Sequence, residues 1–252
     1  MNNMPPSEAI VNPFRGGNAP DIGPVVFLVS NGEDLRSIAA HAGVDETAGI
    51  DLYMSRLYMD RNSGASFAAA GPFVGAPYAV MLLETLIAWG AKKIVFFGWC
   101  GAISTQVKTG DIIVPTGAYS DEGTSRHYHP EGDGAVLPST EVSEQVAAAF
   151  QRREHTILTG DIWTTDAIYR ETREKVVHFQ ERNVLAVEME LSAIYTVGNF
   201  RNVAVGAVLV VSDELSSLTW RPGFGEKRFK ASRRIICDTI GDLCRTPSGM
   251  TK

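Results

Sequence analysis

Five short apolar runs recur along this chain of 252 residues, and helical patterns lie between several of them. Each run is flanked by Gly, Pro, Ser or Asp, and none shows the apolar–polar alternation of a strand with one wet face. Strands that are buried on both faces and alternate with helices favour a mixed, largely parallel sheet. We therefore predict a single-domain, three-layer α/β/α sandwich around such a sheet. The runs are VVFLVS from Val25, KKIVFFG from Lys92, DIIVP from Asp111, HTILTG from His155 and VAVGAVLVVS from Val203.

The chain ends differ from the part between them. Residues 1–22 are rich in Pro, Asn and Gly, which predicts an irregular N-terminal arm, and residues 246–252 predict a loose tail. Between these ends, residues 23–245 contain no visible linker or repeat. The whole chain has 44% hydrophobic and 21% charged residues, and residues 23–245 are expected to form one globular domain.

Composition excludes several function classes. A net charge of −6 without a basic run argues against nucleic acid as a partner. No apolar stretch approaches the roughly 20 residues that cross a bilayer, so no membrane partner is expected. The N-terminus lacks the features of a secretory signal, and the three cysteines match neither a disulfide framework nor a metal pattern. These features predict a cytoplasmic protein with reduced thiols.

Carboxylates follow a short predicted strand at Glu188 and Glu190, with Met189 between them, where a helix is expected to begin. One interpretation is that both are ordinary acids of a first helical turn, where the helix dipole favours negative charge. The other is functional, because an ionised carboxylate accepts hydrogen bonds from two neighbouring sugar hydroxyls. The methionine would then provide an apolar wall for the sugar.

Asp213 directly follows the most apolar run, in the segment VVSDELS. A cap or turn residue is one interpretation. The alternative is a general acid at the edge of the sheet, where ligands of such folds bind.

Cofactor motifs give little signal. Gly32 and the turn Gly98–Gly101 could offer backbone N–H groups to an anion, but no phosphate loop or dinucleotide fingerprint is present. The segment from Glu122 to His129 contains two histidines, yet it lacks a third ligand at useful spacing. We expect neither a metal site nor a bound cofactor.

The motifs together resemble the nucleoside phosphorylases of the purine and uridine type, which are related to methylthioadenosine nucleosidases. The segments NGEDLR, GWCGAIS followed by GDIIVP, TTDAIYR, VEMELSAIY and VVSDEL occur in that family's order, from about Val25 to Leu243. VEME with the downstream SD is the most specific part. The resemblance implies cleavage of a nucleoside by phosphate, which is a co-substrate, to free base and ribose 1-phosphate.

The resemblance implies a homo-oligomer, either a dimer, a trimer or a hexamer.

The resemblance also implies a role for individual residues. The implied roles are ribose binding by Glu190 with Met189 and Glu188, protonation or hydrogen bonding of purine N7 by Asp213, base contact by Ile168 and Tyr169, and phosphate contact by Gly32 and Arg36.

Two departures concern phosphate. Phe96 and Trp99 stand where the family places an arginine and a Ser or Thr that bind phosphate.

Two further assignments stay open. The arginine that assists the catalytic aspartate in purine relatives could correspond to Arg221, Lys227 or Arg228. The arm contains no histidine before Val25, which leaves the partner of the 5′-hydroxyl unassigned.

We take phosphorolysis of a purine nucleoside as the leading hypothesis. Hydrolysis on the same scaffold is the first alternative, with Glu33 or Asp34 as the base that activates water. A nucleoside-binding protein without turnover is the second alternative, although a proton donor at the base would have little use there.

Overall fold

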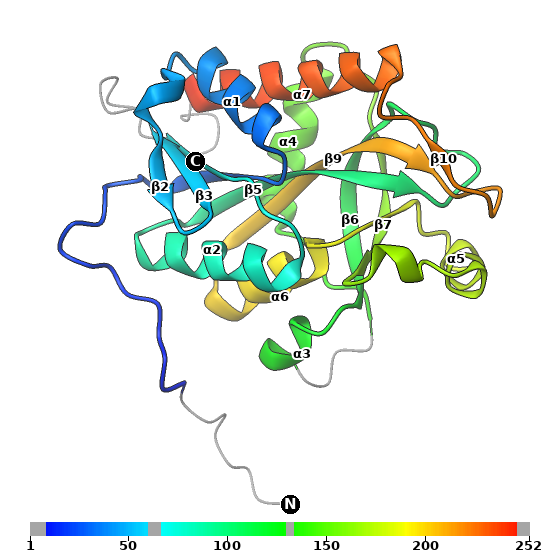
Figure 1. The fold of residues 1–252 in the computed structure, drawn as a ribbon, viewed down its shortest axis with the longest axis horizontal. Coiled ribbons are helices and arrows are strands. Elements are labelled where there is room, and N and C mark those ends of the chain that lie inside the picture. Colours follow the sequence, from blue (N-terminus) through cyan, green and yellow to red (C-terminus); the bar gives the residue numbers. More distant parts are fainter. Residues whose placement is uncertain (1–8, 60–66, 130–133, 246–252) are drawn as a thin grey trace, which may run out of the picture.

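The computed structural model describes residues 9–59, 67–129 and 134–245, so the predicted tail lies outside the described residues. Residues 9–24 contain no helix or strand and run away from the body of the protein at their N-terminal end (Figure 1). No helix in the described ranges is long and apolar enough to span a membrane. The elements are β1 (Val25–Val29), α1 (Gly32–His41), the 3-10 helix η1 (Glu46–Ala48), β2 (Ile50–Leu52), β3 (Ser55–Met59), β4 (Phe67–Gly71), α2 (Ala76–Ala88), β5 (Lys93–Ala102), β6 (Ile112–Asp121), α3 (Ser125–Tyr128), α4 (Thr140–Gln151), β7 (Leu158–Thr165), the 3-10 helix η2 (Ile168–Arg170), α5 (Arg173–Gln180), β8 (Ala186–Glu188), α6 (Leu191–Arg201), β9 (Ala204–Glu214), β10 (Arg221–Pro222) and α7 (Lys227–Arg245).

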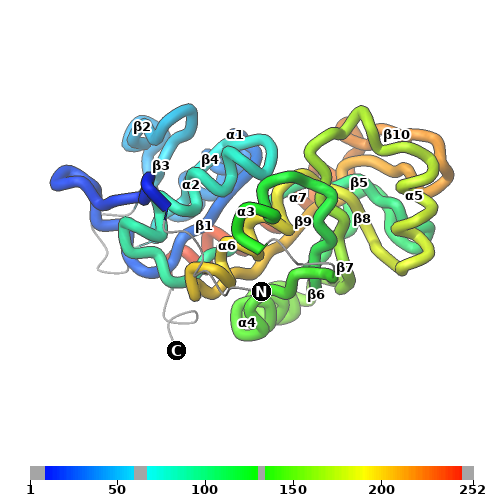
Figure 2. The backbone as a smooth tube through the Cα atoms, turned by 90° about the horizontal axis from the view of Figure 1, so that it is seen from below, coloured from blue at the N-terminus to red at the C-terminus, as the bar shows by residue number. Residues whose placement is uncertain are grey.

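The strands form one mixed sheet in the order β10-β9-β6-β7-β8-β5-β1-β4-β3-β2. Strands β4, β1, β5 and β9 pair in parallel. The apolar runs of β1, β5 and β9 predicted their burial on both faces, whereas β4 was not predicted from the sequence. The prediction of a single α/β domain with a mixed sheet is confirmed. The β2–β3 hairpin lies at one end of the molecule, and α5 and β10 lie at the other (Figure 2).

Half of the sheet closes on itself. Because β9 pairs with β5 as well as with β6, strands β5, β8, β7, β6 and β9 form a ring. The other half of the sheet stays open. Helices cover both faces of its strands, so this half has the predicted three layers. The closed ring brings the ends of β8 and β9 to opposite sides of β5.

Two apolar clusters hold the helices against the sheet. Helices α2 and α6 pack together on one face, while α1 and α7 pack together on the other, which α4 also covers (Figure 1). Phe96 faces the first cluster and Phe97 the second, as expected for neighbours on a strand. A third cluster lies beneath α5 and includes Trp163 and Phe179, whose rings stack at 4.6 Å.

Candidate active site

The strand register places the candidate acid and the candidate sugar ligands at the same level of the ring. Asp213 of β9 lies opposite Gly101 of β5, and Gly101 lies opposite Val187 of β8. Glu188 is the next residue along β8. With about 4.8 Å between neighbouring strands, Asp213 and Glu188 belong to strands roughly 10 Å apart. Residues from two distant parts of the sequence thus border one region.

Glu188 is buried, and both of its carboxylate oxygens are occupied within the protein. Oε2 accepts the backbone N–H groups of Glu190 and Leu191 at 2.7 and 2.8 Å, and Oε1 accepts the Thr164 hydroxyl at 2.5 Å. Glu188 therefore satisfies the unpaired donors at the start of α6, which begins at Leu191 rather than at Glu188 as expected. Its contact with ribose stays a prediction.

Glu190 is also buried, but its hydrogen bonding is less complete. Oε1 accepts the N–H of Gly75 at 2.5 Å, and the backbone N–H groups of Gly75 and Met189 partly offset the effect of burial on the pKa of this carboxyl group. Burial raises the pKa of both Glu190 and Glu188, and repulsion from Glu190 raises the pKa of Glu188 further. Met189, between them, is partly exposed. With fewer hydrogen bonds than Glu188, Glu190 is the carboxylate of this pair with more capacity to accept a ligand's hydroxyl.

A buried polar network that the sequence did not predict supports these carboxylates. Ser192 of α6 connects Thr164 with Glu122. Its N–H donates to Thr164 Oγ1 at 2.9 Å, and its hydroxyl donates to Glu122 Oε1 at 3.0 Å. Glu122 also accepts from Ser120, Thr124 and Ser125. Burial opposes ionisation of Glu122, but the hydrogen bonds from Ser125, Ser120 and Ser192 outweigh it and lower the pKa of this carboxyl group. Glu122 therefore organises its own loop, and the described part of the chain contains no group of three metal-ligand side chains.

Asp213 accepts two side-chain hydrogen bonds. Ser212 donates to Oδ1 at 2.6 Å, and the indole N–H of Trp220 donates to Oδ2 at 2.8 Å. Trp220 was not singled out from the sequence, because an aromatic residue in a loop carries no positional signal. The carboxylate thus has fixed neighbours at the edge of the ring.

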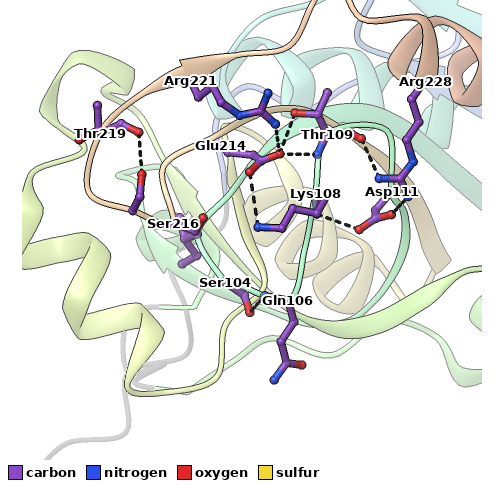
Figure 3. A network of polar contacts seen from close by, with 12 residues as sticks. Ser104, Gln106, Lys108, Thr109, Asp111, Glu214, Ser216, Thr219, Arg221 and Arg228 are labelled. Atoms are coloured by element: carbon purple, nitrogen blue, oxygen red, sulfur yellow. Dashed lines mark hydrogen bonds and ion pairs between the residues drawn. The ribbon is translucent and has the colours of Figure 1, made fainter.

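None of the three basic candidates contacts Asp213 in the part of the chain that the structure describes. Arg221 pairs with Glu214, and Arg228 pairs with Asp111 (Figure 3). Lys227, at the start of α7, is exposed. The prediction that one of them assists Asp213 finds no support in these contacts.

Gly32 and Arg36 lie together at the start of α1. A Cβ atom on Gly32 would lie 3.7 Å from an Arg36 guanidinium nitrogen. No hydrogen bond or ion pair joins the exposed Arg36 side chain to another described residue. Asn31 caps the helix by accepting the N–H groups of Glu33 and Asp34. Arg36 is therefore available to an anion, although phosphate binding stays a prediction.

Asp34, one of the two candidate bases for hydrolysis, is buried and fully engaged. Its Oδ1 accepts from Arg233 Nε and Nη2 at 2.9 and 2.7 Å, and its Oδ2 accepts from Trp99 Nε1 at 2.8 Å. Arg233 also stacks on Trp99, with 4.6 Å between its guanidinium carbon and the ring centre. The second candidate, Glu33, also pairs with Arg233, which lowers the pKa of this carboxyl. Neither carboxylate is free to activate water in this arrangement.

The two departures from the phosphate pattern have different surroundings. Phe96 is fully buried, and its ring lies 5.9 Å from that of Phe73. Trp99 points to the opposite face of the sheet, where Phe229 meets it edge-on at 5.0 Å. Phe96 has no polar atom in its side chain, and the Trp99 N–H is already donated to Asp34. Neither side chain has a donor left for phosphate.

The segment after β7 contains the predicted base-contacting residues. Ile168 and Tyr169 form η2, but their side chains are 52% and 97% exposed. Tyr169 thus packs on almost nothing within this chain, and base contact by both residues stays a prediction. The next helix, α5, begins at Arg173.

Comparisons with known proteins agree with this geometry. Residues 24–240 match the family model described as the Phosphorylase superfamily. A guanosine phosphorylase of Halorubrum lacusprofundi is 33% identical over 142 residues, which are 56% of this chain and 58% of that protein. A DeoD-type purine nucleoside phosphorylase of Bacillus cytotoxicus is 31% identical over 153 residues, which are 60% and 65%. The matched stretches thus span about three fifths of these relatives' length.

A solved structure gives the same fold over a longer stretch. It is a Plasmodium knowlesi homolog of the P falciparum PNP, with a TM-score of 0.74 and 22% sequence identity. The alignment covers 94% of this chain and 97% of that one. At this identity the likeness establishes the architecture.

Proposed function

Because this chain belongs to the phosphorylase superfamily, we propose that it is a purine nucleoside phosphorylase, which cleaves the N-glycosidic bond with phosphate. The observation that carries the proposal is that Asp213 and Val187 lie level on either side of β5, which puts Glu188 one residue from the level of Asp213. An acid for the base and carboxylates for the sugar thus border one region, as a nucleoside requires.

The residues divide the reaction between them. Glu190 accepts hydrogen bonds from the ribose hydroxyls, and Asp213 hydrogen-bonds N7 as the base leaves. Gly32 and Arg36 hold the phosphate that attacks C1′ of the sugar. Such positioning converts a bimolecular attack into one within a complex. Ile168, Tyr169 and Met189 border the nucleoside in this proposal.

A homo-oligomer is part of the proposal, and an exposed apolar patch supports it. Tyr53 and Met54 lie against α2, where Tyr53 contacts Thr85 at 3.1 Å and the Met54 N–H donates to Tyr78. Both side chains are mostly exposed, as is Val74 just before that helix. Apolar patches of this kind are typical of protein interfaces.

Hydrolysis is the second candidate, and one observation favours it. Phe96 and Trp99 leave Arg36 as the single cation proposed to hold phosphate, which weakens a dianion site considerably. The engaged states of Glu33 and Asp34 argue in the opposite direction, because water would lack its proposed base.

The test is base release from purine and pyrimidine nucleosides with and without phosphate, with chromatographic detection of the sugar product. Phosphate-dependent release of ribose 1-phosphate from purine nucleosides is expected. Free ribose released without phosphate would establish a hydrolase instead, and no release from any nucleoside would favour a binding protein.

A further inference from the structure

The indole of Trp220 makes a hydrogen bond that core packing does not explain. This side chain is 60% exposed, yet its N–H donates to Asp213 Oδ2 at 2.8 Å. None of the three cations considered above contacts this carboxylate in the part of the chain that the structure describes. A neutral donor therefore stands at the candidate acid, in the place where purine relatives are expected to have an arginine.

The turn that joins β9 to β10 fixes the position of Trp220. Arg221, the next residue, pairs with Glu214 across the two strands (Figure 3). Near the start of the turn, Gln180 of α5 donates to Ser216 O at 3.0 Å. Contacts at both ends thus anchor the turn, so the indole reaches the carboxylate from a defined backbone position.

The oxygen that accepts the indole N–H lies close to the backbone of β5. A Cβ atom on Gly101 would be 3.1 Å from Asp213 Oδ2 and 2.7 Å from Leu215 Cδ1. The approach of these side chains to the strand therefore requires glycine at this position. An indole N–H only donates, so Oδ2 has to act as an acceptor as long as the contact with Trp220 is kept.

The other oxygen of Asp213 has a partner that can turn away. Ser212 donates to Oδ1 at 2.6 Å, but its hydroxyl oxygen also lies 3.1 Å from Cys100 O, which is a second acceptor. A hydroxyl has one proton and rotates to suit its surroundings. When Oδ1 carries a proton, Ser212 can donate to Cys100 O instead, and its buried hydroxyl still has an acceptor.

We propose that Trp220 is a positioning residue for Asp213, which keeps Oδ2 as an acceptor and leaves Oδ1 as the oxygen that carries the proton to the leaving base. The electron pair of the breaking N-glycosidic bond passes to the base, and N7 takes the proton from Oδ1. Ser212 then turns back to donate to the carboxylate. The inference rests on the proposed function, although the contact between Trp220 and Asp213 can be measured without turnover.

The contact is tested by the indole N–H resonances of the whole isotope-labelled protein, which contains four tryptophans. Trp220→Phe identifies the resonance of Trp220 by its loss. In Asp213→Ala this resonance is expected to move upfield and to exchange faster with water, because the indole loses a charged acceptor. A resonance that stays unchanged in Asp213→Ala would overturn the proposal.

The role in the reaction is tested by kinetics at pH 8, where an unperturbed histidine is neutral. Trp220→Phe keeps an aromatic ring without the N–H, and kcat for purine nucleosides is expected to fall about tenfold. The KM values for nucleoside and phosphate should stay within about threefold of the parent, because other residues make those contacts. Trp220→His restores a donor on a five-membered ring and should recover most of kcat.

Trp89→Phe is the matched control, because Trp89 directly follows α2, before the amino end of β5 and away from Asp213. Its kcat should equal that of the parent. The proposal would be overturned if Trp220→Phe were as fast as this control, or if Trp220→His were no faster than Trp220→Phe. If the parent cleaved no nucleoside, the proposed function would fail, whereas the indole resonance would still show whether Trp220 holds Asp213.

Discussion

Arg233 of α7 holds Asp34 of α1 through two hydrogen bonds of 2.9 and 2.7 Å, although 199 positions separate the two residues. Trp99 completes the arrangement by donating to the second oxygen of Asp34. The first turn of α1 is thereby tied to the last helix and to β5. This contact stabilises the helix end that presents Gly32 and Arg36.

Loss of the Asp34–Arg233 pair should destabilise the fold. Arg233→Met leaves a buried carboxylate without its cation, which costs about 3 to 5 kcal/mol in comparable pairs. The measurement is the free energy of unfolding in urea. Arg234→Met is the matched control, since the Arg234 side chain is 85% exposed, and its effect should stay within about 0.5 kcal/mol. Equal stability of the two variants would show that the pair contributes little.

Asp213→Asn should reduce purine nucleoside cleavage about 10²-fold while the protein stays folded, because an amide cannot donate a carboxyl proton to N7. Steady-state kinetics with circular dichroism checks both parts of this prediction. Glu226→Gln, which removes a surface carboxylate paired with Arg221, should leave kcat unchanged. Near-normal turnover of Asp213→Asn would remove this residue as the acid.

Glu190→Gln should raise the KM for nucleosides about tenfold or more, since ribose loses a charge-assisted hydrogen bond. Glu188→Gln is the matched change on a carboxylate whose oxygens are both occupied, and its KM should stay within about threefold of the parent. If the KM values of both variants rose equally, the distinction between the two carboxylates would be wrong.

Arg36→Ala should raise the KM for phosphate about tenfold or more, with a smaller effect on the KM for the nucleoside. Initial rates over a phosphate series give both constants. The control is Arg152→Ala, an exposed change at the end of α4. A phosphate KM equal to that of the control would mean that phosphate binds elsewhere.

Stability should fall as the pH rises from about 5 to about 8, owing to Glu188 and Glu190. Burial raises the pKa of both carboxyl groups in the folded state, so the folded protein retains protons that the unfolded chain has lost above its glutamate pKa of about 4.3. The stabilisation is therefore complete at low pH and is lost as the pH passes the raised values. Urea unfolding of the parent and of Glu188→Gln/Glu190→Gln should show a smaller pH dependence in the double variant; identical slopes would contradict the assignment.

The apolar runs and their flanking residues were enough to predict the elements that carry the site. The runs from Val25, Lys92 and Val203 became β1, β5 and β9, because a strand buried on both faces must be apolar throughout. The mixed α/β domain was predictable for the same reason, whereas the family followed from the resemblance of motifs such as VEMELSAIY and VVSDEL. The start of a helix was less predictable: α6 begins at Leu191, three residues after Glu188, because the Glu188 side chain accepts the N–H groups of Glu190 and Leu191 at the start of that helix.

The sequence alone determined which segments are buried and which carboxylates follow strands, because periodicity and turn residues are local signals. Only the tertiary structure decided what those side chains contact. Closure of β9 onto β5 set Asp213 level with Val187, next to Glu188, and the pairing of Arg233 with Asp34 occupied a candidate base. Strand β4, with the sequence FAAAG, was also missed, since an alanine run acquires its strand conformation from pairing with β1 and β3. Contacts between residues far apart in the chain depend on how the elements pack, and no local pattern records them.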